Sequence, residues 1–303
     1  MSVTQGRFGE RAMRRAMLDV ADQIDADTQD ARLLRLTNNA VYALPAEEVV
    51  IRITRSQGLQ PRVDKVVALA RWLQEVDGPA NRLAPGVEQP VRSGDLLATV
   101  WEYLPNHEPA PTVTDLGRVL RAFHGLGEPP FRLPVWDPLG DARSRLADAE
   151  SLPDADREFL LDWCERLALR VADLNDRADR GLVHGDAHAG NLLRDRNADV
   201  VLCDFDPTCR GPWQVDLVAV AVGEARFGRA GAHKQLAAAY GYDVTTDPDW
   251  PLLREARELK MVAAAVPLLA STPGIATEFD TRLHTIRRGD HSARWTPFAD
   301  LRR

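Results

Sequence analysis

Lysine is nearly missing from this sequence. Of the 38 residues that are Lys or Arg, only Lys65, Lys234 and Lys260 are lysine. Over most of the chain, a role that other proteins give to lysine must therefore go to arginine, whose planar guanidinium binds in a different geometry.

Cysteine and long apolar runs are also scarce. The three cysteines, Cys164, Cys203 and Cys209, have no paired spacing, which argues against a disulfide framework and favours a reducing compartment. The longest strongly apolar run, 261–270, contains Pro267 and is only about half a membrane span. The N-terminus has no apolar signal core, because charged residues begin at Arg7. The sequence thus predicts a cytoplasmic protein that does not associate with membranes.

Length and charge narrow the class of protein further. The 303 residues are 45% hydrophobic and 27% charged, which is enough for one large domain or two small ones with a substantial core. A formal net charge of -7 disfavours binding to nucleic acid, because the phosphate backbone would be repelled. We expect a monomer or a homodimer.

The first third of the chain alternates between two hydrophobic periods. Apolar residues recur at helical spacing over 8–25 and again over 62–76. Short apolar runs separated by turn residues predict strands at 33–36, 41–44, 49–53, 86–91 and 96–101. This pattern predicts a small sheet with a helix inserted after its third strand.

The character of the sequence changes after Tyr103. A proline-rich connector at 104–111 is the best candidate for a hinge. The stretches that follow it read as helices at 114–126, 140–151, 154–178, 213–227, 230–240 and 250–270. The exception is 182–206, where two short apolar runs are separated by polar turns. We therefore expect an N-terminal domain over 1–103 and a C-terminal domain over 104–303.

That exceptional stretch carries the chemically informative motif. His184, Gly185 and Asp186 are followed after four residues by Asn191, and Asp204-Phe205-Asp206 follows the apolar run 200–203. Apolar runs on both sides supply rigid flanks from which a loop can project its polar groups.

This pair of segments resembles the catalytic loop and the metal loop of the aminoglycoside phosphotransferase family, a group of kinase-like small-molecule phosphotransferases. The resemblance covers nearly the whole chain. It implies an α+β, bilobal, protein-kinase-like fold with a five-stranded antiparallel sheet lobe and a mainly helical lobe. It also implies transfer of the γ-phosphate of ATP, with GTP as an open alternative, to a hydroxyl group of a small polar molecule.

The resemblance assigns roles to the motif residues. Asp186 is expected to accept or orient the proton of the attacking hydroxyl, and Asn191 and Asp204 are expected to hold Mg²⁺, which prefers oxygen ligands. His184 and Asp216 are expected to support the catalytic loop. His124, by contrast, is expected only to pack between helices.

The nucleotide site is expected in the small lobe. Contacts to the nucleotide are predicted for Arg52, Asn38, Asn39, Glu102 and Leu104. Arg52 is the one basic residue in an apolar strand, where kinases use lysine to hold phosphate oxygens. Asp64, on the following helix, is the candidate carboxylate for orienting it.

The acceptor site is less well defined by the sequence. Asp206, His188, Glu224 and Glu258 are the polar residues expected nearest to the acceptor. Carboxylates there would suit a cationic aminoglycoside or amino sugar, although a solvated helix face is an equally good interpretation of Glu224 and Glu258. The sequence does not choose the acceptor.

Two other functions compete with phosphotransfer. His184, Asp186 and His188 have the spacing of metal ligands in hydrolases, and Asp204 could complete such a site. The remaining histidines are scattered, however, and this hypothesis explains neither Asn191 nor Arg52. The other competitor is a nucleotide-binding pseudoenzyme, which is disfavoured because every catalytic position is filled.

Overall fold

The computed structural model describes residues 9–36, 39–54, 60–105, 108–149, 151–269, 273–298 and 300–302. They form two compact units. The first comprises Met1–Pro111, Pro129–Phe131 and Gly190–Pro207, and the second comprises Thr112–Glu128, Arg132–Ala189 and Thr208–Arg303. The division after residue 103 that the sequence suggests stays a prediction.

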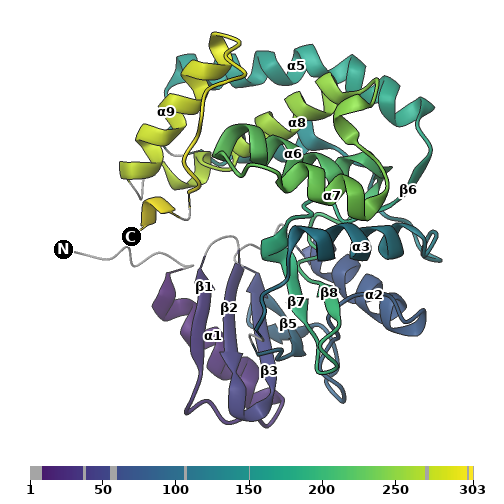
Figure 1. Ribbon diagram of the computed structural model, residues 1–303. Helices are drawn as coiled ribbons and strands as arrows, with labels where there is room; N and C mark the ends of the chain where they lie inside the picture. The colour runs from purple at the N-terminus through teal and green to yellow at the C-terminus, as the bar shows by residue number, and fades with distance from the viewer. Residues whose placement is uncertain are drawn as a thin grey trace. The chain divides into compact units, whose positions relative to one another are not determined.

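The first unit is built on a five-stranded antiparallel sheet, as predicted (Figure 1). Its strands run in the order β1-β2-β3-β5-β4. The strand bounds are Arg32–Leu36 for β1, Asn39–Leu44 for β2, Val49–Thr54 for β3, Val91–Ser93 for β4 and Leu96–Glu102 for β5. In β3, Ile51 and Ile53 are buried and alternate with Arg52, so that the basic side chain lies on the opposite face.

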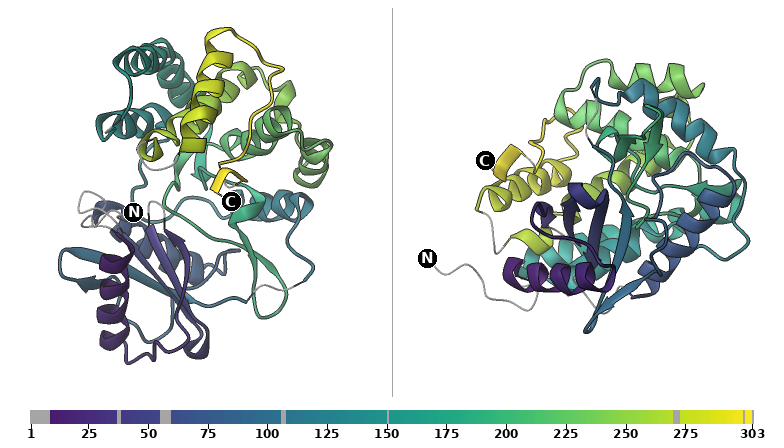
Figure 2. Two further views of the ribbon diagram at one scale, coloured as in Figure 1. Left: turned by 90° about the vertical axis from the view of Figure 1, so that its left-hand side faces the viewer. Right: turned by 90° about the horizontal axis from the view of Figure 1, so that it is seen from below.

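Two helices belong to this sheet unit. Helix α1 (Glu10–Gln23) lies along one face of the sheet, as Figure 2 shows, and buries Met13, Met17 and Val20 in a common cluster with Ile51 and Ile53. Helix α2 (Gln60–Glu75) follows β3 in the sequence, in agreement with the predicted insertion.

A late hairpin also belongs to the first unit. Strands β7 (Leu192–Arg194) and β8 (Val200–Leu202) pair with each other, and the Asn81 N–H donates to the carbonyl of Leu202 over 2.9 Å. The Cys203 N–H donates to the carbonyl of Asn191 over 3.0 Å. The segment that leads to Asp204 is therefore anchored in the same unit as the sheet.

The second unit is mainly helical. Its helices are α3 (Val113–His124), α4 (Pro138–Ala147), α5 (Asp154–Arg177), α6 (Gln214–Phe227), α7 (Ala232–Tyr240), α8 (Trp250–Ala263) and α9 (Pro273–Arg287). A hairpin of β6 (Arg180–Val183) and β9 (Cys209–Pro212) flanks the catalytic loop. Within the part of the chain that the structure describes, no helix is long and apolar enough to cross a bilayer.

One helical boundary and one whole helix differ from the prediction. The single helix expected over 250–270 ends at Ala263 and gives way to a short 3-10 turn at Val266–Leu268, because Pro267 cannot continue an α-helical hydrogen-bond ladder. Helix α9 was not predicted. Its buried Ile275, Phe279 and Leu283 recur at a spacing of four, which is the signal that could have revealed it.

Candidate active site

The catalytic loop is held in shape by one buried carboxylate. Asp216, in the first turn of α6, is fully buried and accepts the N–H of His184 and the N–H of Gly185, each over 2.7 Å. Gly185 has φ +80°, a left-handed conformation that costs glycine little. The loop that carries Asp186 is therefore anchored at its backbone.

A histidine and a tyrosine support that carboxylate in turn. His124 Nε2 lies 3.0 Å from Asp216 Oδ2, and its Nδ1 lies 2.9 Å from the hydroxyl of Tyr240. Burial alone would raise the pKa of Asp216, but its hydrogen bond with His124 and the neighbouring His184 bring the net pKa below the ordinary value. Burial, together with the charge of Asp216, raises the pKa of Tyr240 to about 12. His124 thus does more than pack between helices.

Asp186 lies between two cations on helix α8. Its Oδ1 accepts from Arg257 Nη1 over 2.6 Å and lies 3.2 Å from Lys260 Nζ, which also donates to the carbonyl of Gly185 over 2.9 Å. Burial would raise the pKa of Asp186, but the charges of Lys260 and Arg257, with a smaller effect of His188, hold it well below its usual range. The carboxylate is therefore ionised at neutral pH.

Arg257 and Lys260 were missed by the sequence interpretation. They are three residues apart on one helix, a spacing that brings two side chains to one face. Lys260 is also one of only three lysines in a chain that otherwise uses arginine. That rarity is the sequence signal that could have directed attention to it.

The first unit gathers a second set of charged residues around Arg52. Its guanidinium donates to both carboxylate oxygens of Asp206, over 2.8 and 2.5 Å, and to Asp204 over 3.0 Å. Two further side chains contact Asp206. Asn39 donates to its carboxylate over 3.2 Å, and Lys65 donates to the backbone carbonyl of Asp206 over 2.6 Å.

The charges of this set shift each other's pKa. Burial would lower the pKa of Arg52, but Asp206 and Asp204 outweigh it, and the net pKa is raised. Burial would raise the pKa of Asp206, and Arg52 reverses this to a net lowering. Arg52 and Asp206 are therefore both charged at neutral pH.

The structure does not pair Asp64 with Arg52. Asp64 is exposed on α2 and is not a hydrogen-bond partner of Arg52, whose described partners are Asp204 and Asp206. The reason is helical register, since Val63, Val66 and Val67 face the core and leave Asp64 on the solvent side. Asn38 lies outside the described residues.

The backbone at the end of β5 is partly hydrogen-bonded within the protein. The Glu102 N–H donates to the carbonyl of Arg82 over 2.9 Å, and the Tyr103 N–H donates to the carbonyl of Glu48 over 2.7 Å. Among the described residues, none accepts a backbone hydrogen bond from the N–H of Leu104. The nucleotide contacts expected of Glu102 and Leu104 stay predictions.

The donors of Asn191 and Asp204 fit a hard divalent cation. Asn191 is 2% exposed, and Asp204 has φ +66°, a conformation that non-glycine residues adopt rarely and chiefly at functional sites. A carboxylate and an amide supply the oxygen atoms that Mg²⁺ prefers. Burial and the charge of Asp204 raise the pKa of the neighbouring Cys203 thiol to about 12.

The geometry disfavours a transition-metal hydrolase. Among the described residues, no three His, Cys, Asp or Glu side chains form a group that could hold a metal ion. His184 is fully buried, and its Nδ1 accepts the N–H of Asp186 over 3.4 Å. The carboxylate of Asp186 is bound by Arg257, so that the His-x-Asp-x-His segment does not converge on one point.

The four residues predicted near the acceptor separate into different environments. His188 lies beside Asp186, with its Nε2 4.0 Å from Oδ2. Asp206 is instead bound to Arg52, and Glu224 accepts the N–H of His233 over 2.7 Å at the start of α7. Glu224 is therefore a helix cap, which its position on the preceding helix did not reveal.

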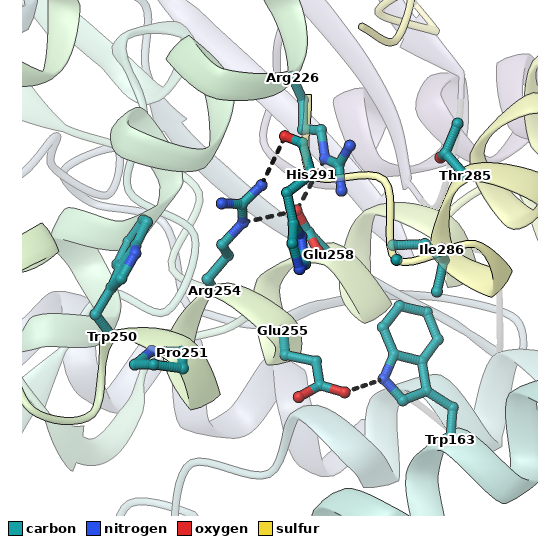
Figure 3. A pocket seen from close by; sticks show the side chains of 11 residues that line it. Trp163, Arg226, Trp250, Pro251, Arg254, Glu255, Glu258, Thr285, Ile286 and His291 are labelled. Atoms are coloured by element: carbon teal, nitrogen blue, oxygen red, sulfur yellow. Dashed lines mark hydrogen bonds and ion pairs between the residues drawn. The ribbon is translucent and has the colours of Figure 1, made fainter. Parts of the chain in front are cut away.

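Glu258 is the clearest correction. It is 2% exposed and accepts from Arg226 Nε over 2.8 Å and from Arg254 Nε over 3.0 Å, as Figure 3 shows. These three residues lie at the edge of a cavity of about 470 Å³ that is also lined by Trp163 and Trp250. Glu258 is neutralised by two arginines and is not available to pair with an ammonium group of a substrate.

Comparisons with known proteins agree with this arrangement. The model of the phosphotransferase enzyme family matches residues 24–259. An amicoumacin kinase in complex with AMP-PNP, Ca²⁺ and Ami is 15% identical, with a TM-score of 0.69, and the match covers 96% of this chain and 99% of that one. These values are typical of a shared fold with diverged sequences.

Two further solved structures are similar. An aminoglycoside phosphotransferase from Streptomyces rimosus is 19% identical, with a TM-score of 0.62 over 82% of this chain and 98% of that one. A choline kinase from Streptococcus pneumoniae is 14% identical, with a TM-score of 0.62 over 89% and 98%. No curated protein matches the sequence. The structural likenesses confirm the predicted kinase-like α+β fold.

Proposed function

The chain belongs to the phosphotransferase enzyme family, and from this premise we propose that it transfers the γ-phosphate of ATP to a hydroxyl group of a small polar molecule. The observation that carries the proposal is Asp186, an ionised carboxylate on a loop anchored by Asp216 and fixed between Arg257 and Lys260. A carboxylate held in this way can orient an alcohol and accept its proton.

In the proposed reaction, the acceptor oxygen forms a bond to the γ-phosphorus while the bond from that phosphorus to the β–γ bridging oxygen breaks. ADP leaves, and the hydroxyl proton passes to Asp186. Because Arg257 and Lys260 lower the pKa of Asp186, the residue is a weak base, and we assign it mainly to orienting the hydroxyl. A strong base is not required, because catalysis of phosphoryl transfer through a loose transition state depends mainly on positioning and charge neutralisation.

Arg52 and the metal loop supply the proposed nucleotide site. Asn191 and Asp204 would hold Mg²⁺, which, when bound, neutralises charge on the phosphate oxygens. Arg52 is proposed to contact the phosphates through its guanidinium, and Leu104 is proposed to donate its N–H to the base. The amicoumacin kinase structure contains AMP-PNP and Ca²⁺, which supports a metal–nucleotide ligand here.

Replacement of Asp186 tests the proposal. The purified protein is incubated with ATP and a panel of small hydroxyl compounds, and ADP formation that depends on the acceptor is measured. We expect Asp186→Asn and Asp186→Ala to lower kcat by about 10²–10⁴-fold and to leave ATP binding nearly unchanged. The exposed Asp176 on α5 provides the control variant Asp176→Asn, which should behave as wild type.

Two results would contradict the proposal. Turnover near the wild-type rate in Asp186→Ala would remove the residue from the reaction. Binding of ATP by the wild-type protein without turnover of any acceptor would favour the pseudoenzyme.

A further inference from the structure

The immediate surroundings of Asp186 carry an excess of positive charge. Arg257 and Lys260 bring two positive charges against the single negative charge of Asp186, and His188 adds a third when it is protonated. An ammonium group that approached Asp186 would therefore meet two like charges. This is the opposite of the acidic acceptor site that the sequence suggested.

The carboxylates of the neighbouring helices do not compensate for this charge. Glu258 is bound by two arginines, and Glu224 caps α7. Glu255 accepts from the indole of Trp163 over 2.9 Å and from Arg170 over 3.1 Å. The acidic groups of α6 and α8 are therefore committed to partners within the protein.

The two cations also have binding capacity to spare. Arg257 uses Nη1 for Asp186, and its Nε is buried without a hydrogen-bond partner, although a guanidinium has five N–H groups to donate. The side chains of Arg257 and Lys260 keep 18% and 25% of their surface exposed. A ligand can therefore reach them.

A small cavity of about 20 Å³, with room for about one water molecule, lies beside these cations, and no acidic side chain is among the described residues that line it. Arg257 and Lys260 share its wall with apolar residues such as Trp136, Val215 and Leu253. An anionic group would therefore bind at the exposed surface of Arg257 and Lys260 and not inside the cavity.

On the basis of the proposed function, we propose that the acceptor alcohol carries an anionic group, a carboxylate or a phosphate, that is bound by Arg257 and Lys260. Arg257 binds the anion through the N–H groups that Asp186 leaves unused, and Lys260 contributes its charge. The acceptor hydroxyl then reaches Asp186 from the same side. Arg257 and Lys260 are thus specificity-determining residues as well as neighbours of the catalytic carboxylate.

Fractionation of natural metabolites by charge tests the substrate class. A small-molecule cell extract is passed over an anion exchanger at pH 10, where carboxylates and phosphates are retained and simple amines, which are cationic or neutral, pass through. Each fraction is incubated with the full-length protein and γ-³²P-ATP. We expect labelled product from the retained fraction. Labelled product from the flow-through alone, or turnover of the polycation kanamycin, would overturn the inference.

The two proposals fail in different ways in this experiment. Label in neither fraction would overturn the proposed phosphotransfer and this inference with it, whereas label in the flow-through alone would overturn only this inference. Treatment of the retained fraction with alkaline phosphatase separates the two anion sources. Loss of acceptor activity identifies a phosphate, and retention identifies a carboxylate.

Variants of Arg257 test the binding role with the purified acceptor. For a carboxylate acceptor, the ratio of kcat/KM between the acid and its primary amide should be large in the wild type. In Arg257→Gln this ratio should fall by at least tenfold, and Arg257→Lys should restore part of it. A phosphate acceptor is compared with its dephosphorylated alcohol in the same way.

The control is Arg254→Gln, one turn earlier on α8, where the side chain faces Glu258 instead of Asp186. It should leave the ratio unchanged. A merely structural effect of Arg257, or an effect through the pKa of Asp186, lowers kcat/KM for both compounds and leaves their ratio intact. An unchanged ratio in Arg257→Gln would therefore exclude the proposed contact.

Discussion

At the scale of single residues, the ionisation of Asp186 depends on its partners rather than on its exposure. Burial favours the neutral acid, and Lys260 and Arg257 reverse that preference. Asp216 follows the same rule with His124 as its partner. For each of these carboxylates, burial raises the pKa and the partners lower it. Replacement of a partner removes one effect and leaves the other.

The pH profile of kcat should reveal these opposing effects. A carboxylate with a lowered pKa is ionised above that pKa, so the acidic limb of the wild-type profile should lie below the ordinary value of about 3.9. In Lys260→Ala, burial still favours the neutral form of Asp186, but the charge that opposes it most strongly is lost. The pKa of Asp186 should therefore rise, and the acidic limb of the profile should move to higher pH. Lys234→Ala, at an exposed position, should not move it. An acidic limb unchanged in Lys260→Ala would contradict this account of Asp186.

Asp204 offers a second test at this scale. Because its φ is +66°, alanine there would add backbone strain, and Asn is the better replacement since it tolerates this conformation. Asp204→Asn should weaken the binding of Mg²⁺–ATP at least tenfold, about 1.4 kcal/mol, by removing a charged ligand. Calorimetric titration with and without Mg²⁺ measures this. Equal affinities in the two proteins would remove Asp204 from the metal site.

At the scale of secondary-structure elements, helix α8 sorts its charged residues by face. Arg254 and Glu258, four apart, make an ion pair on the side of Arg226, whereas Arg257 and Lys260 face Asp186. The first face stabilises the packing of α8 against α6, and the second belongs to the candidate active site. Substitutions on the first face should therefore change mainly stability, and substitutions on the second face should change mainly activity.

Removal of Glu258 should affect stability and spare catalysis. Arg226 is fully buried, so Glu258→Ala leaves an uncompensated charge inside the protein and should lower the free energy of unfolding by about 3–5 kcal/mol. Urea denaturation measures the loss, and the acceptor KM should stay near the wild-type value. The exposed pair of Arg143 and Glu165 provides the comparison, since Glu165→Ala should cost less than about 1 kcal/mol. A rise in acceptor KM without a loss of stability would restore Glu258 to the acceptor site.

At the scale of the whole molecule, each unit holds one part of the proposed machinery. Arg52, Asn191 and Asp204 belong to the first unit, and Asp186 and Arg257 belong to the second. Although Asp186 and Asn191 are only five positions apart, the chain passes from one unit to the other between Ala189 and Gly190. The short motif is thus one of the places where the chain crosses from one unit to the other.

This division predicts that kinetic defects separate by unit. Arg52→Ala should raise the KM for ATP at least tenfold and change the acceptor KM little, because its partners Asp204 and Asp206 lie in the first unit, with the proposed metal ligands. Arg52→Lys should recover part of the loss. Two-substrate steady-state kinetics measure both constants, and the exposed Arg118 provides the control Arg118→Ala. Equal changes in both KM values would contradict the separation.

The sequence by itself determined the features that are encoded locally. Short apolar runs between turn residues predicted the sheet, although β4 lies at Val91–Ser93 instead of 86–91, and helical spacing predicted the inserted helix and most of the later helices. The motif placed Asp186, Asn191 and Asp204 on loops between apolar runs. Helix α9 was missed because its apolar residues are widely spaced. The end of α8 was misplaced because Pro267 interrupts an apolar run that otherwise suits a helix.

Only the tertiary structure decided which charges meet. Asp64 and Lys65 are neighbours in the sequence, yet helical register sends Lys65 to Asp206 and leaves Asp64 exposed. Glu258 and Arg257 are also adjacent, and one is neutralised in the interior while the other binds Asp186. Ion pairs between distant segments depend on packing and not on local spacing. For that reason the sequence suggested carboxylates beside Asp186, and the fold places Arg257 and Lys260 there.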